Sequence, residues 1–136
     1  MALTPSITTA VANAMLSGGF VGTPTNSGKL RIYDGVMPTD SNTALSGNNL
    51  LAELTLNATA FPAPSGGVLT ANAVSSGTAA ATGTASFFRI YSSNGTTVIS
   101  QGSVGTSGCD MNINSTAIQS GANVSVTSLT ITQPQS

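Results

Sequence analysis

The sequence predicts a mainly β protein, built as an antiparallel β-sandwich or jelly roll with a short N-terminal helix. Three observations support this fold class. Beyond Gly28, glycine, asparagine, serine and proline separate short segments rich in β-branched and large apolar residues, the pattern of many short strands. Apolar and polar residues alternate within several of these segments. Helical apolar spacing occurs only near the N-terminus.

The chain has 136 residues, which fits one domain with its own core. We expect a helix or arm over residues 1–19 and a β-sandwich domain over residues 28–136. Thr4 can cap the helix, Pro5 suits its first position and Gly18 can end it. Two interpretations stay open: the helix packs on its own domain, or it is an arm that docks on a neighbouring molecule. Its apolar stripe consists of Ile7, Val11, Ala14 and Met15.

The β region is expected to consist of short strands joined by turns and loops. Long loops are predicted at residues 34–49 and 61–67, where proline or glycine interrupts the apolar pattern. The stretch from Thr70 to Thr84 consists mostly of small residues, and we interpret it as a loosely patterned strand with a loop. The expected strands cover residues 29–34, 49–56, 58–62, 67–73, 84–92, 96–101, 109–114 and 122–132.

Two local patterns predict finer features of these strands. The apolar alternation shifts by one residue between Val126 and Leu129, which predicts a β-bulge near Thr127–Ser128. Ser93–Asn94–Gly95 is the strongest hairpin signal, because Asn-Gly tolerates the positive φ angles of a tight turn. In the strand at 49–56, alternation places Leu50, Ala52, Leu54 and Leu56 on one side and Leu51, Glu53 and Thr55 on the other.

A short motif occurs twice along the chain. Arg31 and Tyr33 lie in the stretch LRIYDG, and Arg89 and Tyr91 lie in the similar stretch FRIY. In both, Arg and Tyr share one strand face. The repeat is either a coincidence of strand composition or a matched Arg/Tyr face that is available to a partner. Arginine and tyrosine are favoured anchors of protein interfaces, so these four residues are candidate interface residues, together with Ile7 and Val11.

Charged residues are scarce, at 5% of the chain, and histidine is absent. An ordinary soluble domain is about a quarter charged. Without histidine, a Ser-His-Asp or Cys-His catalytic arrangement within one chain is excluded. The three cations are too scattered to follow a nucleic-acid backbone. We therefore expect no enzyme, no cofactor and no nucleic-acid partner, and a protein that works as part of an assembly.

The remaining chemical candidates have structural interpretations. Asp34 and Asp40 bracket a turn and are expected to accept hydrogen bonds from backbone N–H groups rather than to act in catalysis or to bind a metal. The glycine-rich segment Gly102–Gly108 lacks the lysine of a phosphate-binding loop, and we interpret it as a connection between two strands. Cys109 is expected to be a half-buried free thiol, with an intermolecular disulfide as the alternative.

The N-terminus has no basic segment before its apolar residues, and no apolar run approaches the roughly 20 residues of a membrane span. Synthesis in the cytoplasm and no membrane partner are therefore expected.

Two stretches resemble virion proteins of tailed bacteriophages: Leu30–Leu56 (LRIYDGVMPTDSNTALSGNNLLAELTL) and Ser86–Gly108 (SFFRIYSSNGTTVISQGSVGTSG). The most similar group is the small all-β capsid cement, or decoration, proteins. The resemblance implies a sandwich or jelly roll that binds the outer capsid shell as a dimer or trimer, across seams between major capsid proteins. It implies residence in the virion after synthesis in the host cytoplasm.

Other functions remain alternatives. The chain is similar in style to other virion parts, so a tail, baseplate or head-fibre subunit is the first alternative. A pilus or surface-layer subunit would need export. A glycan hydrolase would need catalytic carboxylates among Asp34, Asp40, Glu53 and Asp110. A carbohydrate-binding module would need an aromatic platform, and the chain has two tyrosines and no tryptophan.

Overall fold

The computed structural model describes Ala14, residues 25–39 and residues 43–132. These residues form a mainly β protein, which confirms the mainly β part of the expected fold class. The expected N-terminal helix, with Ile7 and Val11, lies outside the described residues except for Ala14. No helix in the described part of the chain is long and apolar enough to span a membrane.

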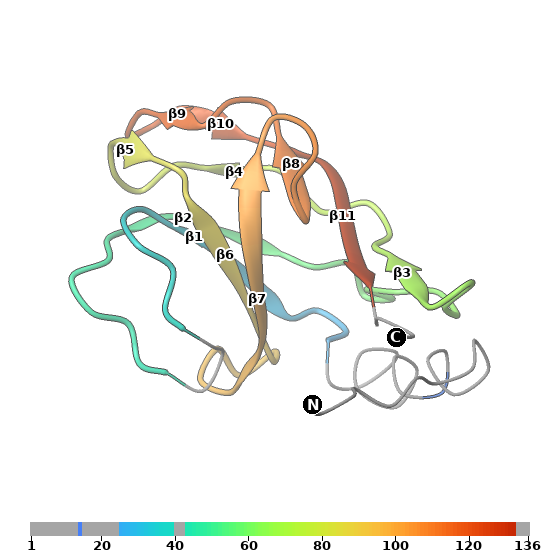
Figure 1. Ribbon diagram of the computed structural model, residues 1–136. Helices are drawn as coiled ribbons and strands as arrows, with labels where there is room; N and C mark the ends of the chain where they lie inside the picture. The colour runs from blue at the N-terminus through green and yellow to red at the C-terminus, as the bar shows by residue number, and fades with distance from the viewer. Residues whose placement is uncertain (1–13, 15–24, 40–42, 133–136) are drawn as a thin grey trace.

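Seven strands form one sheet in the order β2-β1-β6-β7-β8-β11-β3 (Figure 1). Two short ladders, β10-β4 and β5-β9, accompany it. The strands are β1 (Lys29–Tyr33), β2 (Leu50–Thr55), β3 (Val68–Thr70), β4 (Gly77–Thr78), β5 (Gly83–Thr84), β6 (Phe87–Tyr91), β7 (Val98–Gly105), β8 (Met111–Ile113), β9 (Ala117–Ile118), β10 (Asn123–Val124) and β11 (Val126–Thr132).

This arrangement matches the expected antiparallel pairing except at one place, because β7 and β8 run parallel. Seven of the described strands make one mixed sheet and the other four make the two short ladders, so a jelly-roll sandwich is not confirmed. Most expected strands are present within a few residues. The expected strand at 58–62 is wrong: this segment is irregular, and its Ala60 and Phe61 are buried in the core.

The core lies against one face of the seven-stranded sheet. In adjacent strands the residues on this face are in register, as in the pairs Ile32↔Phe88, Val104↔Met111 and Ile131↔Leu69. All of the fully buried apolar residues except Phe87 and the two tyrosines belong to one cluster. This one cluster contains residues from both edge strands of the sheet, β2 and β3. The sheet must therefore curl around the face that carries the core. Members from across the sheet are Leu54, Leu30, Ile90, Met111, Leu129 and Leu69.

Hydrogen bonds cover part of the outer edge of β2 and join the segment after β2 to the segment after β3. Ala80 donates its backbone N–H to the carbonyl of Leu51 at 2.7 Å, which protects the outer edge of β2. Beyond this strand, Asn72, which follows β3, donates its N–H to the carbonyl of Ala60 at 2.9 Å. These bonds bring the two ends of the sheet together. Covered edges offer no template for unwanted pairing with another chain.

Two β-bulges change the side-chain alternation. The register of β11 against β8 shifts between Val126 and Ser128, which confirms the bulge expected there. A second shift in the β1-β2 ladder leaves Leu51 between the paired residues Leu50 and Ala52. Leu51 is therefore buried in the core, and the expectation that it shares the outer face with Glu53 is wrong. A bulge puts two successive residues opposite one and rotates the strand locally.

The expected hairpin joins β6 to β7. Gly95 donates its N–H to the carbonyl of Ser92 at 2.8 Å and has a φ of 75°. Asn94 contributes through its side chain, whose Oδ1 accepts the N–H groups of Thr96 at 2.9 Å and Thr97 at 3.2 Å. Gly95 therefore adopts the positive φ expected for the Asn-Gly turn, while the side chain of Asn94 accepts hydrogen bonds within the loop.

The glycine-rich segment is largely strand rather than connection. β7 continues through Gly105, so the connection to β8 begins only after it. A Cβ atom at Gly102 would lie 2.8 Å from both Asp110 Oδ2 and the ring of Phe88. Glycine is needed there because neighbouring groups pack against the backbone, and a sequence pattern does not distinguish this role from a turn.

Candidate functional site

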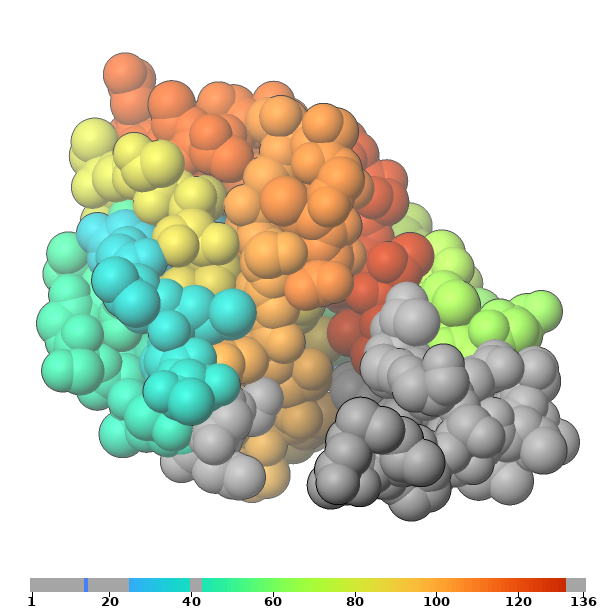
Figure 2. Space-filling model, viewed as in Figure 1, coloured from blue at the N-terminus to red at the C-terminus, as the bar shows by residue number. Residues whose placement is uncertain are grey.

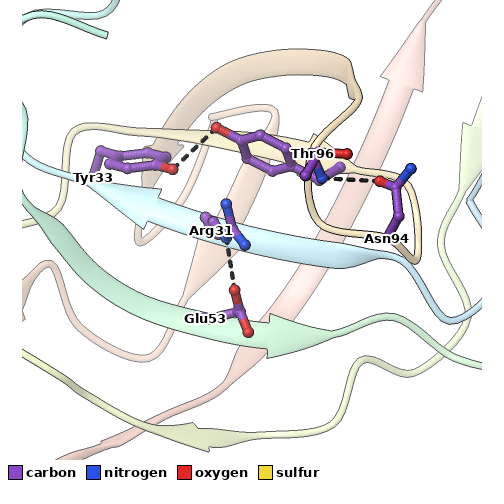
Figure 3. Close-up of polar contacts among 6 residues, drawn as sticks. Arg31, Tyr33, Glu53, Asn94 and Thr96 are labelled. Atoms are coloured by element: carbon purple, nitrogen blue, oxygen red, sulfur yellow. Dashed lines mark hydrogen bonds and ion pairs between the residues drawn. The ribbon is translucent and has the colours of Figure 1, made fainter.

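The four Arg and Tyr residues of the repeated motif lie together on the outer face of β1 and β6. Arg31 is the register partner of Arg89, so the two arginines lie side by side. The hydroxyl groups of Tyr33 and Tyr91 are 3.1 Å apart and hydrogen-bonded (Figure 3). The sequence repeat thus corresponds to two adjacent strands with a matched face.

Most of this face is buried within the chain. The exposed fractions of Tyr33, Arg89 and Tyr91 are 4%, 2% and 6%. Burial and the bond to Tyr91 raise the pKa of Tyr33 to about 12. A partner of the folded chain reaches little of these three side chains, so the surface available for docking lies elsewhere. The physical reason is the loop after β1, which covers the face.

Arg31 is the more accessible arginine. Its Nε lies 2.6 Å from Glu53 Oε2, and its guanidinium lies 4.5 Å from the ring centroid of Tyr91 (Figure 3). Burial acts to lower the pKa of Arg31, but the hydrogen bond and the charge of Glu53 outweigh it, so the pKa is raised. The side chain is therefore held as a cation between a carboxylate and an aromatic ring.

The buried Arg89 ties the loop to the sheet. Its Nε donates to Gln101 Oε1 at 3.1 Å, and its Nη2 donates to the carbonyl of Thr43 in the loop. Gln101 in turn donates its amide N–H to the carbonyl of Pro38 at 2.8 Å. Two backbone carbonyls, one from each described half of the loop, are thus bound by side chains of β6 and β7.

A second set of bonds closes the base of the loop. The carboxylate of Asp34 accepts the backbone N–H of Asn49 at 2.6 Å and its side-chain N–H at 3.1 Å. Asn48 donates to the carbonyl of Asp34 at 2.7 Å. The bonds from Asn49 lower the pKa of Asp34. A loop with close ends and its own internal bonds is an Ω-loop. We call residues 34–39 and 43–49 the anchored loop.

The anchored loop presents the large exposed apolar residues of the described chain, Val36 and Met37, which are 86% and 40% exposed. In Figure 2 the loop (cyan and teal) stands at the surface on the left of the molecule. A cavity of about 270 Å³ adjoins them and is lined in part by Pro38, Thr43 and Ala44. The sequence analysis missed this pair. The sequence signal for it is the presence of two adjacent large apolar residues, Val36 and Met37, within a predicted loop.

The described carboxylates have structural roles. Glu53 binds Arg31, and Asp34 binds Asn49. Asp110 Oδ2 accepts the N–H of Ser103 at 3.0 Å. Asp40 lies outside the described residues. Within the described ranges no three His, Cys, Asp or Glu side chains gather as a metal site would require.

Cys109 is half-buried, as expected, and forms no disulfide within the described part of the chain. Comparisons with protein-family models, with curated proteins and with solved structures found no match to this chain.

Proposed function

We propose that this protein is a structural component of a tailed-phage virion, a cement protein that binds the outer capsid shell across seams between major capsid proteins. The observation that carries the proposal is the anchored loop. Hydrogen bonds of Asp34 and Arg89 hold this loop in place, and it keeps the side chains of Val36 and Met37 exposed to solvent. Large apolar side chains kept exposed on a fixed loop are typical of interaction sites. The resemblance of Leu30–Leu56 to virion proteins covers this loop.

The scarcity of charge agrees with such a role. Interface cores are depleted of charged residues, and this chain has 5%. Burying one large apolar side chain in a partner contributes about 1.5–3 kcal/mol, or roughly tenfold to a hundredfold in affinity. Many copies, each joining two capsid proteins, would add this free energy at every seam. Binding only to the expanded shell stabilises that state by mass action.

The proposal includes a dimer or trimer of this chain. It also includes a sandwich-like packing of the curled sheet within each copy. The alternative virion positions differ in copy number, because a shell-binding protein is present in hundreds of copies and a tail, baseplate or head-fibre subunit in few. Quantitative mass spectrometry of purified particles measures this number. Few copies, found with tail fractions, would favour the alternative.

Binding to isolated shells tests the role of the loop. Purified protein is mixed with expanded shells that lack it, and the bound fraction is measured by sedimentation. Val36→Ser and Met37→Ser are expected to weaken binding by about tenfold each, because each removes apolar contact area. Ala80→Ser changes an exposed residue outside the anchored loop and is the matched control. Unchanged binding of both loop variants would contradict the proposal.

Salt dependence is a second test of the same contact. Arg31 is paired with Glu53, and Arg89 is buried, so these charges are not free to attract a partner. Screening acts mainly on exposed charges, and we expect the bound fraction to change little between low and high salt. Release of the protein at high salt under otherwise mild conditions would show that exposed charges hold it.

A further inference from the structure

The turn between β6 and β7 contains the dipeptide Asn94–Gly95, and Asn-Gly occurs once in the chain. In an unfolded chain this dipeptide modifies itself: the backbone nitrogen of glycine attacks the side-chain carbon Cγ of asparagine and closes a five-membered succinimide ring. Glycine permits the attack because it has no Cβ atom to obstruct the approach. Asn94 is exposed to solvent. The conformation of the turn therefore determines whether this reaction occurs in the folded chain.

The turn is a type I β-turn. Gly95 donates its N–H to the carbonyl of Ser92 at 2.8 Å, so Ser93 and Asn94 are the two central residues. In the described part of the chain, the non-glycine residue with a positive φ is Ser27, so both central residues have a negative φ. Among hydrogen-bonded β-turns this combination defines type I, in which the second central residue has a ψ of about 0°.

The closed turn keeps the reacting atoms apart. The five atoms of a succinimide ring lie close to one plane, so the nitrogen of Gly95 has to eclipse the Cβ atom of Asn94. From the type I turn this requires the ψ of Asn94 to rotate by about 120°. The rotation carries the N–H of Gly95 away from the carbonyl of Ser92 and breaks the bond that closes the turn. The turn and the ring therefore exclude each other.

The side chain of Asn94 is held in the closed turn as well. Its Oδ1 accepts the backbone N–H groups of Thr96 at 2.9 Å and Thr97 at 3.2 Å, the first of which is drawn in Figure 3. It also accepts the hydroxyl of Ser92 at 2.5 Å. Three donors at this oxygen would stabilise the negative charge that ring closure places on it. They are in place only while the turn is closed, when the nitrogen of Gly95 does not reach Cγ.

We propose that Asn94 is a modification site that reacts when the hairpin turn opens, independently of the proposed function. After the nitrogen of Gly95 loses its proton to a base in the solvent, it forms a bond to Cγ of Asn94. The bond from Cγ to the side-chain nitrogen breaks, and this nitrogen takes up a proton and leaves as ammonia. Water then opens the ring at either carbonyl and returns a hydrogen to the nitrogen of Gly95. The products are aspartate and isoaspartate, each with one new negative charge.

The isoaspartate product does not fit the original turn. It adds one carbon to the main chain between Asn94 and Gly95, and a longer chain has to pass the same neighbours. Space beside the turn is limited, because a Cβ atom on Gly95 would lie 3.1 Å from Nη2 of Arg31. The turn joins β6 to β7, which carry the Arg89 and Gln101 side chains that hold the anchored loop. The modification therefore marks copies whose hairpin has opened.

Peptide mapping by mass spectrometry, after incubation at mildly alkaline pH, measures aspartate and isoaspartate at position 94. The folded chain is compared with the same chain unfolded in urea. We expect the folded chain to react at least about tenfold more slowly, because local opening of the turn has to precede ring closure. Ser92→Ala removes the hydroxyl donor and should speed the reaction of the folded chain about twofold to tenfold. Ser93→Ala makes the same change at the exposed neighbouring residue and is the matched control.

Rates of each variant are expressed relative to the same variant in urea, so that any effect on the intrinsic reaction cancels. Far-UV circular dichroism verifies that both variants are folded. A folded chain that reacts as fast as the unfolded chain would overturn the proposal. A faster reaction in the folded chain would also overturn it, since the donors to Oδ1 would then activate Asn94. Equal relative rates for Ser92→Ala and Ser93→Ala would contradict the restraint by the side-chain bonds.

Discussion

Arg89 and Arg31 are register partners that differ in burial, and this difference predicts unequal effects of the same substitution. Arg89 is 2% exposed, whereas the side chain of Arg31 is 25% exposed. Replacing each in turn with methionine keeps an unbranched side chain of similar length and removes the charge and the donors. The pair is therefore a matched comparison within one ladder.

For Arg89→Met, we expect the free energy of unfolding to fall by about 2–4 kcal/mol. A hydrogen bond from a charged donor contributes about 1.5–3 kcal/mol. The substitution removes the bonds to Gln101 Oε1 and to the carbonyl of Thr43. Part of the loss is recovered because Thr43 is exposed and its carbonyl can bind water after the loop moves. The loss expected from these two bonds is therefore smaller than their full value.

For Arg31→Met, we expect a loss of about 1 kcal/mol or less. Exposed ion pairs contribute about 0–1 kcal/mol, and the methionine side chain still covers the ring of Tyr91. Because the chain has no tryptophan, far-UV circular dichroism during urea unfolding is the suitable measurement. Limited proteolysis reports separately whether the anchored loop has detached. Two results together would refute the conclusion that Arg89 holds the loop on the sheet. Arg89→Met would lower the free energy of unfolding no more than Arg31→Met does, and the anchored loop would remain resistant to proteolysis.

Replacing Gly102 with alanine is expected to lower the free energy of unfolding by about 1–3 kcal/mol, because its Cβ would lie 2.8 Å from the Phe88 ring; Phe88→Leu in the same chain should recover part of this loss in urea unfolding. Since the folded chain raises the pKa of Tyr33 from 10.0 to about 12, stability is full below pH 10 and falls as the pH rises through the folded value. In Tyr33→Phe this alkaline fall should be reduced, which unfolding at a series of pH values measures. The lowered pKa of Asp34 has the opposite sign: its contribution is present above the usual aspartate pKa and is lost as acid protonates the carboxylate. The Asn49 amide should therefore exchange faster, relative to its intrinsic rate, in strong acid, and Asp34→Ala should show fast exchange at every pH.

Local patterns predicted the parts of the fold that depend on neighbouring residues. Alternation located most strands, and the shift between Val126 and Leu129 located a bulge. The turn chemistry of Asn94–Gly95 located the hairpin. These features are determined by side-chain periodicity and by the backbone freedom of a few residues, both of which are visible in sequence.

Features that depend on distant contacts were not predictable in this way. Gly102 is glycine because Phe88 and Asp110 lie against it, and both belong to other strands or loops. The burial of Arg89 depends on a loop that begins more than 50 residues earlier in the chain and returns over the sheet. The structure therefore favours the matched-face interpretation of the Arg/Tyr motif over coincidence, while the loop that covers this face was not predicted.

Most of the charged side chains in the described part of the chain are used within the fold, and this restricts what its surface can bind. Arg89 binds the loop, Arg31 and Glu53 bind each other, and Asp110 binds Ser103. A partner with a strongly charged surface would lose solvation of its charges on contact and find little opposite charge in return. An uncharged surface has no such penalty and can cover the exposed apolar pair of the anchored loop. We therefore expect the partner surface that contacts Val36 to be apolar. We expect its border to carry uncharged groups that hydrogen-bond to the polar residues around the anchored loop.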